Sequence, residues 1–223
     1  MRQLEISDII PAMKLPEVVF FPYTILPLYI FEPRYREMLD DVLEGERMFT
    51  VLSDLADPTE DSPALNPECV TLGCVRACQT YDDGTALVLL EGLCRIEIAE
   101  YLEVKNYPQV RIRNRIIPRS DPFQLELLKD ETLHLLGHIM KRGGKIDPDV
   151  LDHLTGTELP QVFVDQAAAS LLKNPDEKHR ILQCRDPIQR YGVLLKYLRE
   201  DLQQMESENQ SLENNDRGRF GMN

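Results

Sequence analysis

The hydrophobic pattern of this 223-residue chain changes near residue 120, and that change limits the possible fold more than any single motif does. Before it, apolar residues come in short or alternating runs separated by Pro, Gly and Asp-Gly, a pattern typical of β-strands joined by tight turns. After it, apolar residues recur every three or four positions, as on one face of an α-helix. The pattern predicts an α+β protein, with a β-rich lobe in residues 1–118 and a helical subdomain in residues 119–206.

The strongest strand signal in the first half surrounds Asp83-Gly84, a dipeptide that favours a two-residue hairpin turn between residues 68–81 and 85–91. One helix is expected to interrupt the strands, because Pro33 suits a first helical position and apolar residues from Tyr35 to Leu43 follow helical spacing. Further strands are expected at 18–21, 25–30, 48–53, 94–102 and 109–117. Antiparallel strands with tight turns predict a closed or half-closed barrel.

The second half is divided by Asx-Pro pairs, in which a capping side chain precedes a proline whose missing N–H costs nothing at the first helical position. The pairs are Asp121-Pro122, Asp147-Pro148, Asn174-Pro175 and Asp186-Pro187. Helices are therefore expected near 122–141, 148–154, 160–173, 175–184 and 187–206. The polar, Asn-rich tail 207–223 is predicted to be disordered, and the acidic segment 54–68 to be an exposed loop.

Charge and composition narrow the class of protein. The chain has 25 Lys and Arg against 38 Asp and Glu, a formal net charge of -13 that opposes general binding to nucleic acids. It has neither a run of about 18 apolar residues nor the basic-then-apolar start of a signal peptide, so we expect a cytoplasmic protein that does not span a membrane. The five cysteines are expected to be reduced thiols.

Catalytic and metal-binding motifs are missing from the sequence. The Gly-Lys pair at 144–145 is followed by Ile146 and lacks the upstream glycine of a P-loop, and no Gly-x-Ser-x-Gly elbow occurs. Cys69, Cys74 and Cys78 have no second cysteine pair with zinc-finger spacing. The sequence therefore predicts no catalytic residue, no metal site and no cofactor.

The segment VVFFPYTILPLYIF at 18–31 is the first candidate binding element, because it holds many large apolar residues for a chain with few aromatics. Pro22 and Pro27 interrupt regular strand pairing, so part of it is expected to be a loop. Two interpretations stay open for Phe21, Tyr23, Ile25 and Leu26. They either fill the core or form an exposed apolar lip that binds polypeptide.

Arg111, Arg113 and Arg115 are the second candidate, because strand alternation places them on one face. One interpretation is a solvated face whose arginines pair with Glu97 or Glu103 on a neighbouring strand. The other is a docking stripe for an acidic partner or a nucleic acid.

Three blocks of the sequence resemble one known family, the N-terminal substrate-binding domain of Lon proteases. In the first block, LPEVVFFPYTILPLYIFEPRYREMLDDVLEGERMF, the family signature is matched by Phe31, Glu32, Pro33, Arg34 and Tyr35. The second, LGCVRACQTYDDGTALVLLEGLCRIEI, places Gly73, Gly92 and Arg95 in register with the family pattern. The third, beginning at LPQVFVDQAAAS, is similar to its helical subdomain. The chain departs from the family at Phe21-Pro22-Tyr23, where Phe-Pro-Gly is frequent.

The resemblance implies a PUA-like β-barrel lobe with one inserted helix, followed by an α-helical bundle. It implies a stand-alone, non-catalytic module in protein quality control that recognises unfolded or tagged polypeptide segments, with an ATP-dependent protease as a further partner. The alternative is a PUA-like module that binds a small molecule or nucleic acid. The signature residues are expected to be structural, with Glu32 capping the helix, Pro33 starting it, Arg34 bridging it to the barrel and Tyr35 packing inward.

Overall fold

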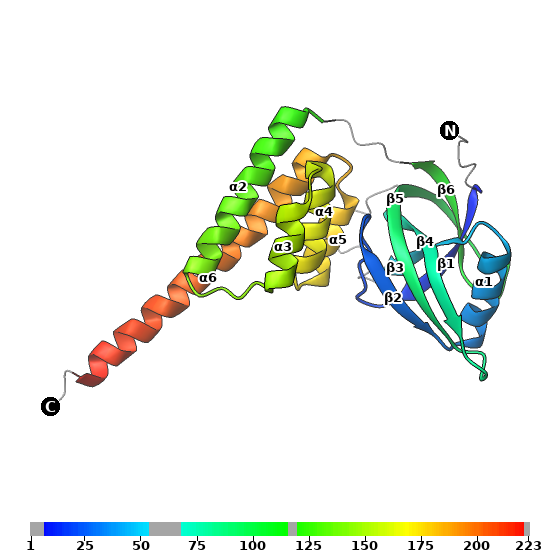
Figure 1. Cartoon of the computed structure of the whole chain (residues 1–223), viewed down its shortest axis with the longest axis horizontal. Helices are drawn as coiled ribbons and strands as arrows, with labels where there is room; N and C mark the ends of the chain where they lie inside the picture. The colour runs from blue at the N-terminus through cyan, green and yellow to red at the C-terminus, as the bar shows by residue number, and fades with distance from the viewer. Residues whose placement is uncertain (1–6, 54–67, 116–119, 221–223) are drawn as a thin grey trace. The chain divides into compact units, whose positions relative to one another are not determined.

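A computed structural model describes residues 7–53, 68–115 and 120–220 (Figure 1). Contacts divide the chain into two compact units, and each is built from two separate stretches of sequence. The β unit comprises Met1–Pro118 with Asp165–Arg185, and the helical unit comprises Arg119–Val164 with Asp186–Asn223. The sequence pattern places 165–185 in the helical subdomain, whereas the contacts place it with the sheet. The expected acidic loop at 54–68 lies outside the described residues except for Glu68.

The β unit is built on one mixed six-stranded sheet in the order β2-β5-β4-β3-β1-β6. Its strands are β1 (Ile9–Leu15), β2 (Ile25–Ile30), β3 (Met48–Ser53), β4 (Cys69–Thr80), β5 (Ala86–Leu102) and β6 (Gln109–Arg115). Strand β6 also pairs with β5, so five strands close on themselves while β2 stays outside this circuit. The described sheet is therefore not the simple barrel that the hairpin pattern predicts, and its β1–β3 pairing is parallel.

Three strands differ from the expected pattern. Residues 18–21, expected as a strand, form none in the structure. Strand β1 is not anticipated, because Pro11 and Lys14 interrupt its apolar alternation. The single long strand β5 covers both expected strands 85–91 and 94–102. Its pairing with β4 shifts by one residue where Leu72 lies opposite Cys94 and Gly73 lies opposite Gly92. The predicted hairpin at Asp83-Gly84 is confirmed, but its turn has three residues, 82–84, and not the expected two, since Tyr81 N–H donates to Thr85 O and Gly84 adopts a φ of 77°.

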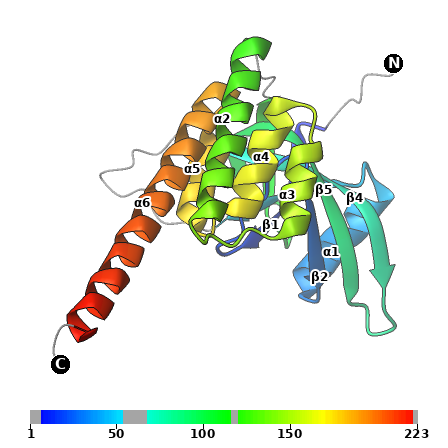
Figure 2. The same cartoon turned by 60° about the vertical axis from the view of Figure 1, so that its left-hand side comes forward.

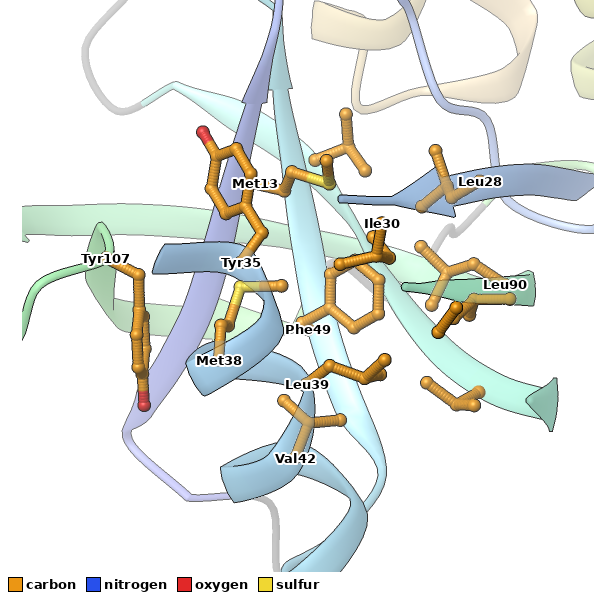
Figure 3. Packing of buried hydrophobic residues seen from close by; sticks show 14 of the residues in the cluster. Met13, Leu28, Ile30, Tyr35, Met38, Leu39, Val42, Phe49, Leu90 and Tyr107 are labelled. Atoms are coloured by element: carbon orange, nitrogen blue, oxygen red, sulfur yellow. The ribbon is translucent and has the colours of Figure 1, made fainter. Parts of the chain in front are cut away.

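The inserted helix α1 (Pro33–Glu44) covers one part of the sheet and supplies four of the fifteen buried residues of a hydrophobic core. Figure 3 shows its side chains pointing toward those of β2, β3 and β5. The labelled members of this core are Met13, Leu28, Ile30, Tyr35, Met38, Leu39, Val42, Phe49, Leu90 and Tyr107. This packing gives strands β2 and β5 a rigid inner face.

The described part of the second half contains five helices, which are α2 (Pro122–Lys141), α3 (Pro148–Gly156), α4 (Pro160–Leu171), α5 (Pro175–Gln183) and α6 (Pro187–Phe220). Four of the five begin where the Asx-Pro pairs predict, and α4 begins at Pro160 after Leu159. At the start of α2, α3, α5 and α6 the Asx side chain accepts a hydrogen bond from the backbone N–H two residues later, at 2.9 to 3.2 Å. Each cap satisfies one backbone donor that the first helical turn leaves without a partner.

In the helical unit, the aromatic side chains of Phe163 and Tyr191 are both fully buried, and their rings stack at 6.2 Å. The Tyr191 hydroxyl donates to the backbone oxygen of Pro160 at 2.8 Å. Helix α6 continues to Phe220, whereas the sequence pattern predicts disorder from residue 207. No proline follows Pro187 and no glycine lies between Gly192 and Gly218, so nothing in the sequence forces the helix to stop earlier.

Candidate binding surface

Strands β2 and β5 lie side by side along the whole length of β2 (Figures 1 and 2). Their antiparallel register runs from Ile25 opposite Glu91 to Ile30 opposite Ala86. Because side chains alternate between the faces of a sheet, Leu28 and Ile30 point into the core. The residues of β2 between them point outward, and the outward-pointing residues of the paired part of β5 are also apolar. The result is an outward face with apolar side chains on both strands.

We define the β2–β5 apolar surface as Ile25, Pro27, Tyr29, Phe31, Leu87 and Leu89. Ile25, Tyr29 and Phe31 are 55%, 54% and 59% exposed, and both leucines are exposed as well. Pro27 lies opposite Leu89 and Tyr29 opposite Leu87, so the side chains of the two strands adjoin. The rings of Tyr29 and Phe31 stack at 6.1 Å. Contiguous exposed apolar side chains of this kind mark binding surfaces in soluble proteins.

The surface carries little charge. Neither β2 nor residues 86–90 of β5 contain an ionisable group other than the Tyr29 hydroxyl, which donates to the Thr85 hydroxyl at 3.0 Å. At one border, Glu91 accepts a hydrogen bond from Arg76, which raises the pKa of the Arg76 guanidinium. At the hairpin, hydrogen bonds from Thr85 lower the pKa of the Asp83 carboxyl. The bordering ions are thus partnered, and the surface suits an apolar ligand.

The turn before β2 is fixed by hydrogen bonds to β5 and α4. Tyr23 N–H donates to Gly92 O at 2.7 Å, and Gly92 N–H donates to Thr24 O at 2.9 Å. The Gln166 amide donates to Tyr23 O at 3.1 Å. A Cβ atom at Gly92 would lie 2.2 Å from Phe21 O, so only glycine allows the chain to pass this closely. The turn therefore presents Tyr23 and Ile25 on a rigid support.

The structure separates the four residues of the predicted apolar lip. Tyr23 and Ile25 are exposed, Leu26 is half-buried against the core, and Phe21 is fully buried. Phe21 therefore belongs to the interior and cannot contact a ligand in this conformation. Tyr29 and Phe31 extend the exposed set. Sequence reasoning missed Leu87 and Leu89, because the run Leu-Val-Leu-Leu is apolar at both parities and does not reveal which side chains face outward.

Most family-signature residues around α1 have structural contacts. Tyr35 is fully buried, and its hydroxyl accepts a hydrogen bond from Lys14 N–H at 3.1 Å. Glu32 occupies the N-cap position but its side chain makes no capping bond; instead it accepts from Arg34 Nε at 2.9 Å. The expected cap by Glu32 and the expected bridge from Arg34 to the barrel are therefore both replaced by one ion pair at the start of the helix. Pro33 is the first helical residue, as expected.

Arg95 joins the sheet to the segment 165–185. Its side chain is almost completely buried and donates to both oxygens of the buried Asp165, at 2.5 and 2.8 Å. Its Nε donates to the backbone oxygen of Leu182 at 3.0 Å. Charge-assisted bidentate bonds of this kind are strong and directional. Gly73, a further signature residue on this part of the sheet, packs where a Cβ would lie 2.6 Å from the Leu90 side chain.

The arginine row lies on β6. Arg111 pairs with Glu100 at 3.2 Å, directly across from it on β5, and both side chains are exposed. Glu97, one of the expected partners, instead pairs with Arg185 at 2.7 Å. Arg113 is exposed, and the side chain of Arg115 lies outside the described set. The docking role of this row stays a prediction.

The family model of the ATP-dependent protease La (LON) substrate-binding domain matches residues 9–200. The chain is 27% identical over 192 residues to a Lon protease of Trichlorobacter lovleyi, covering 85% of this chain and 23% of that protein. It is 27% identical over 210 residues to a Lon protease of Xanthomonas oryzae, covering 92% and 24%. The chain thus spans about a quarter of the length of these curated relatives.

Solved structures agree with this match at the level of fold. The N-terminal domain of a Mycobacterium avium complex Lon protease superposes with a TM-score of 0.66 at 14% identity, covering 85% of this chain and 97% of that one. A Lon N-terminal domain protein from Xanthomonas campestris gives a TM-score of 0.58 at 18% identity, covering 85% and 98%. Within residues 7–53, 68–115 and 120–220, no helix is both long and apolar enough to cross a membrane. The family match over most of the chain shows that it belongs to the Lon substrate-binding domain family.

Proposed function

We propose that this chain is a polypeptide-binding module that holds unfolded or partly folded protein segments on the β2–β5 apolar surface. The observation that carries the proposal is the exposure of Ile25 and Tyr29 on β2, a strand whose inner face is packed into a core, and of Phe31 directly after it. The family description as a substrate-binding domain of an ATP-dependent protease supports the same role. The closed circuit of five strands supports a PUA-like description of the β unit.

A shallow apolar surface suits the binding of many different sequences. Apolar contacts are non-directional, so they do not demand one particular side chain from the ligand, whereas a deep polar pocket would. A ligand that covers all six side chains gains about 1–2 kcal/mol for each, up to about 12 kcal/mol, against a cost of association of about 5 kcal/mol, which leaves up to about 7 kcal/mol of net binding free energy. We therefore expect dissociation constants on the order of 10 μM.

The sequence contains no P-loop and no nucleophile elbow, so we assign no catalytic step to these residues. In the proposed pathway, the bound segment is passed to ATPase and protease domains that lie outside these 223 residues. The location we propose for this activity is the cytoplasm, where unfolded proteins and an ATP-dependent protease would both be accessible.

Fluorescence anisotropy with a labelled polypeptide, kept unfolded by carboxymethylation of its cysteines, tests the proposal. We expect saturable binding by the wild-type protein and none to the folded form of the same polypeptide. The double variant Ile25→Ser, Phe31→Ser should bind at least about tenfold more weakly, because it removes two exposed apolar side chains from the surface.

Val104→Ser is the matched control, because Val104 is an apolar residue of the β unit that is 79% exposed and lies outside the β2–β5 apolar surface. This variant should bind like the wild type. Circular dichroism should show that all variants keep the native fold. Equal affinity of the double variant and the wild type would contradict the proposed site, and no binding by the wild type at tens of micromolar would contradict the proposed function.

A further inference from the structure

Strand β2 is the end strand of the sheet. One of its edges pairs with β5, and within the described residues no strand pairs with the other edge. An open edge presents a row of backbone N–H and C=O groups, which is a template for pairing with another extended chain. Here the exposed apolar side chains of the β2–β5 apolar surface adjoin that edge.

The register fixes which residues supply the open edge. Gly92 N–H donates to Thr24 O at the start of the β2–β5 pairing. Because hydrogen-bonding direction alternates along a strand, the backbone groups of Leu26, Leu28 and Ile30 point toward β5. Those of Ile25, Pro27 and Tyr29 therefore point away from β5. These three residues also carry the outward side chains of β2, so backbone pairing and apolar contact are offered by the same residues.

We infer that a bound polypeptide segment adds to the open edge of β2 as an antiparallel extended strand, with an apolar residue at every second position. The inference rests on the proposed function and states how the ligand is held. In an antiparallel pair, the ligand residues opposite Ile25, Pro27 and Tyr29 place their side chains on the same face as those residues. Apolar side chains at these alternate positions would extend the β2–β5 apolar surface.

Pro27 argues that the added strand comes from another protein and not from a second copy of this chain. Proline has no N–H, so Pro27 offers only its carbonyl oxygen to the edge. A symmetric pairing of two β2 strands centred on Pro27 would place two prolines opposite each other and lose both of their central hydrogen bonds. A foreign strand would still donate its own N–H to Pro27 O. The net charge of -13 further opposes self-association.

Three nine-residue peptides with Val at every second position and polar residues between them test the inference by anisotropy. In the antiparallel arrangement, the amides of the Val residues point toward β2 and those of the polar residues point away. The peptide N-methylated at its Val residues should therefore bind at least about tenfold more weakly than the parent peptide. The peptide N-methylated at its polar residues should bind like the parent and serves as the matched control.

Equal affinity of the two methylated peptides, or a loss confined to the control peptide, would overturn the strand addition. If the carboxymethylated unfolded polypeptide binds while the parent peptide does not, the strand addition fails and the proposed function stands. If neither binds, both fail.

Two further measurements concern Pro27. The variant Pro27→Val restores one backbone donor to the edge and should bind the parent peptide about fivefold more tightly, as expected for one added hydrogen bond. Unchanged affinity would contradict pairing along this edge.

Sedimentation velocity of the wild-type protein without peptide should show a monomer at about 50 μM, which is roughly five times the dissociation constant expected for the bound polypeptide. A dimer that Ile25→Pro dissociates would identify a second copy as the occupant and overturn the inference.

Discussion

At the scale of single residues, the candidate site depends on one close approach between backbones. Gly92 on β5 both donates to Thr24 O and accepts from Tyr23 N–H, so it fixes the turn that leads into β2. The same residue lies so near Phe21 O that no side chain fits. The conformation of Tyr23, which has a φ of 63°, is therefore imposed by its neighbours and not by its own preference.

Replacing Gly92 with alanine should destabilise the β unit. The added Cβ would clash with the Phe21 carbonyl oxygen, and relief of that clash requires a backbone shift that costs about 1–3 kcal/mol. Urea denaturation of the purified variant measures this loss. Gly137→Ala in helix α2 is the control, because a Cβ there meets no atom within 4 Å and alanine favours a helix by up to about 1 kcal/mol. A Gly92→Ala protein as stable as the wild type would contradict the described turn.

At the scale of secondary-structure elements, hydrogen bonds between the sheet and the helical segment 165–185 hold this segment in the β unit. Arg95 on β5 binds Asp165 on α4 and the backbone oxygen at the end of α5. The Gln183 side chain bonds both the N–H and the oxygen of Cys69 on β4, at 2.9 and 3.0 Å. The sheet therefore supports the turn at Tyr23 indirectly as well, since Gln166 of the same segment bonds Tyr23 O.

The variant Arg95→Met should lose about 3–5 kcal/mol of stability, because it leaves the Asp165 carboxylate buried without the guanidinium that neutralises it. The double variant Arg95→Met, Asp165→Leu removes both charges and should recover most of that loss. Urea denaturation of the two variants measures the difference. A double variant that is no more stable than the single one would contradict the claim that the loss of stability comes from the buried Asp165 carboxylate left without its guanidinium.

His179 on α5 makes the attachment of this segment sensitive to pH. Its ring lies 3.4 Å from the Ser53 hydroxyl and 3.2 Å from the Gln183 amide nitrogen, with Glu68 and Asp176 as the nearby acids. Burial lowers the pKa of His179 below its ordinary value of 6.5, and the two carboxylates oppose this only in part. The unfolded chain therefore binds a proton more readily than the folded chain does.

It follows that the free energy of unfolding should fall as the pH is lowered from about 6.5 toward the folded-state pKa, and should be unaffected by this group above that window. Urea midpoints measured between pH 7.5 and 5.5 test this. The variant His179→Gln cannot titrate, so its midpoint should fall less over the same range. Identical pH profiles of the wild type and the variant would show that His179 is not buried as described.

At the scale of the whole molecule, the features that the sequence predicts are those that local chemistry determines. The α+β class follows from the two periodicities, and four helices begin at Asx-Pro pairs because a cap and a first-turn proline act within a few residues. The assignment of 165–185 to the β unit was not predictable, because it depends on a buried contact between Arg95 and Asp165 that no hydrophobic period reveals.

The candidate site was predictable in part for the same reason. Tyr23 and Ile25 follow from an apolar segment interrupted by prolines, which indicates a loop with exposed side chains. The exposure of Leu87 and Leu89 depends on β2 ending the sheet and on α1 packing against the other face of β5, and both are tertiary facts. Phe21 was included in the lip because it belongs to the same proline-interrupted apolar segment, although its own side chain is enclosed.

Site-specific photo-crosslinking tests the central claim most directly. A benzophenone amino acid replaces either Tyr29, on the β2–β5 apolar surface, or Tyr101, which is similarly exposed elsewhere on β5. After irradiation with the carboxymethylated polypeptide, the account predicts a crosslinked product from position 29 and little or none from position 101, and no product with the folded form of that polypeptide. Crosslinking from position 101 alone, or equal crosslinking from both positions, would contradict the claim that β2 and β5 bind unfolded polypeptide.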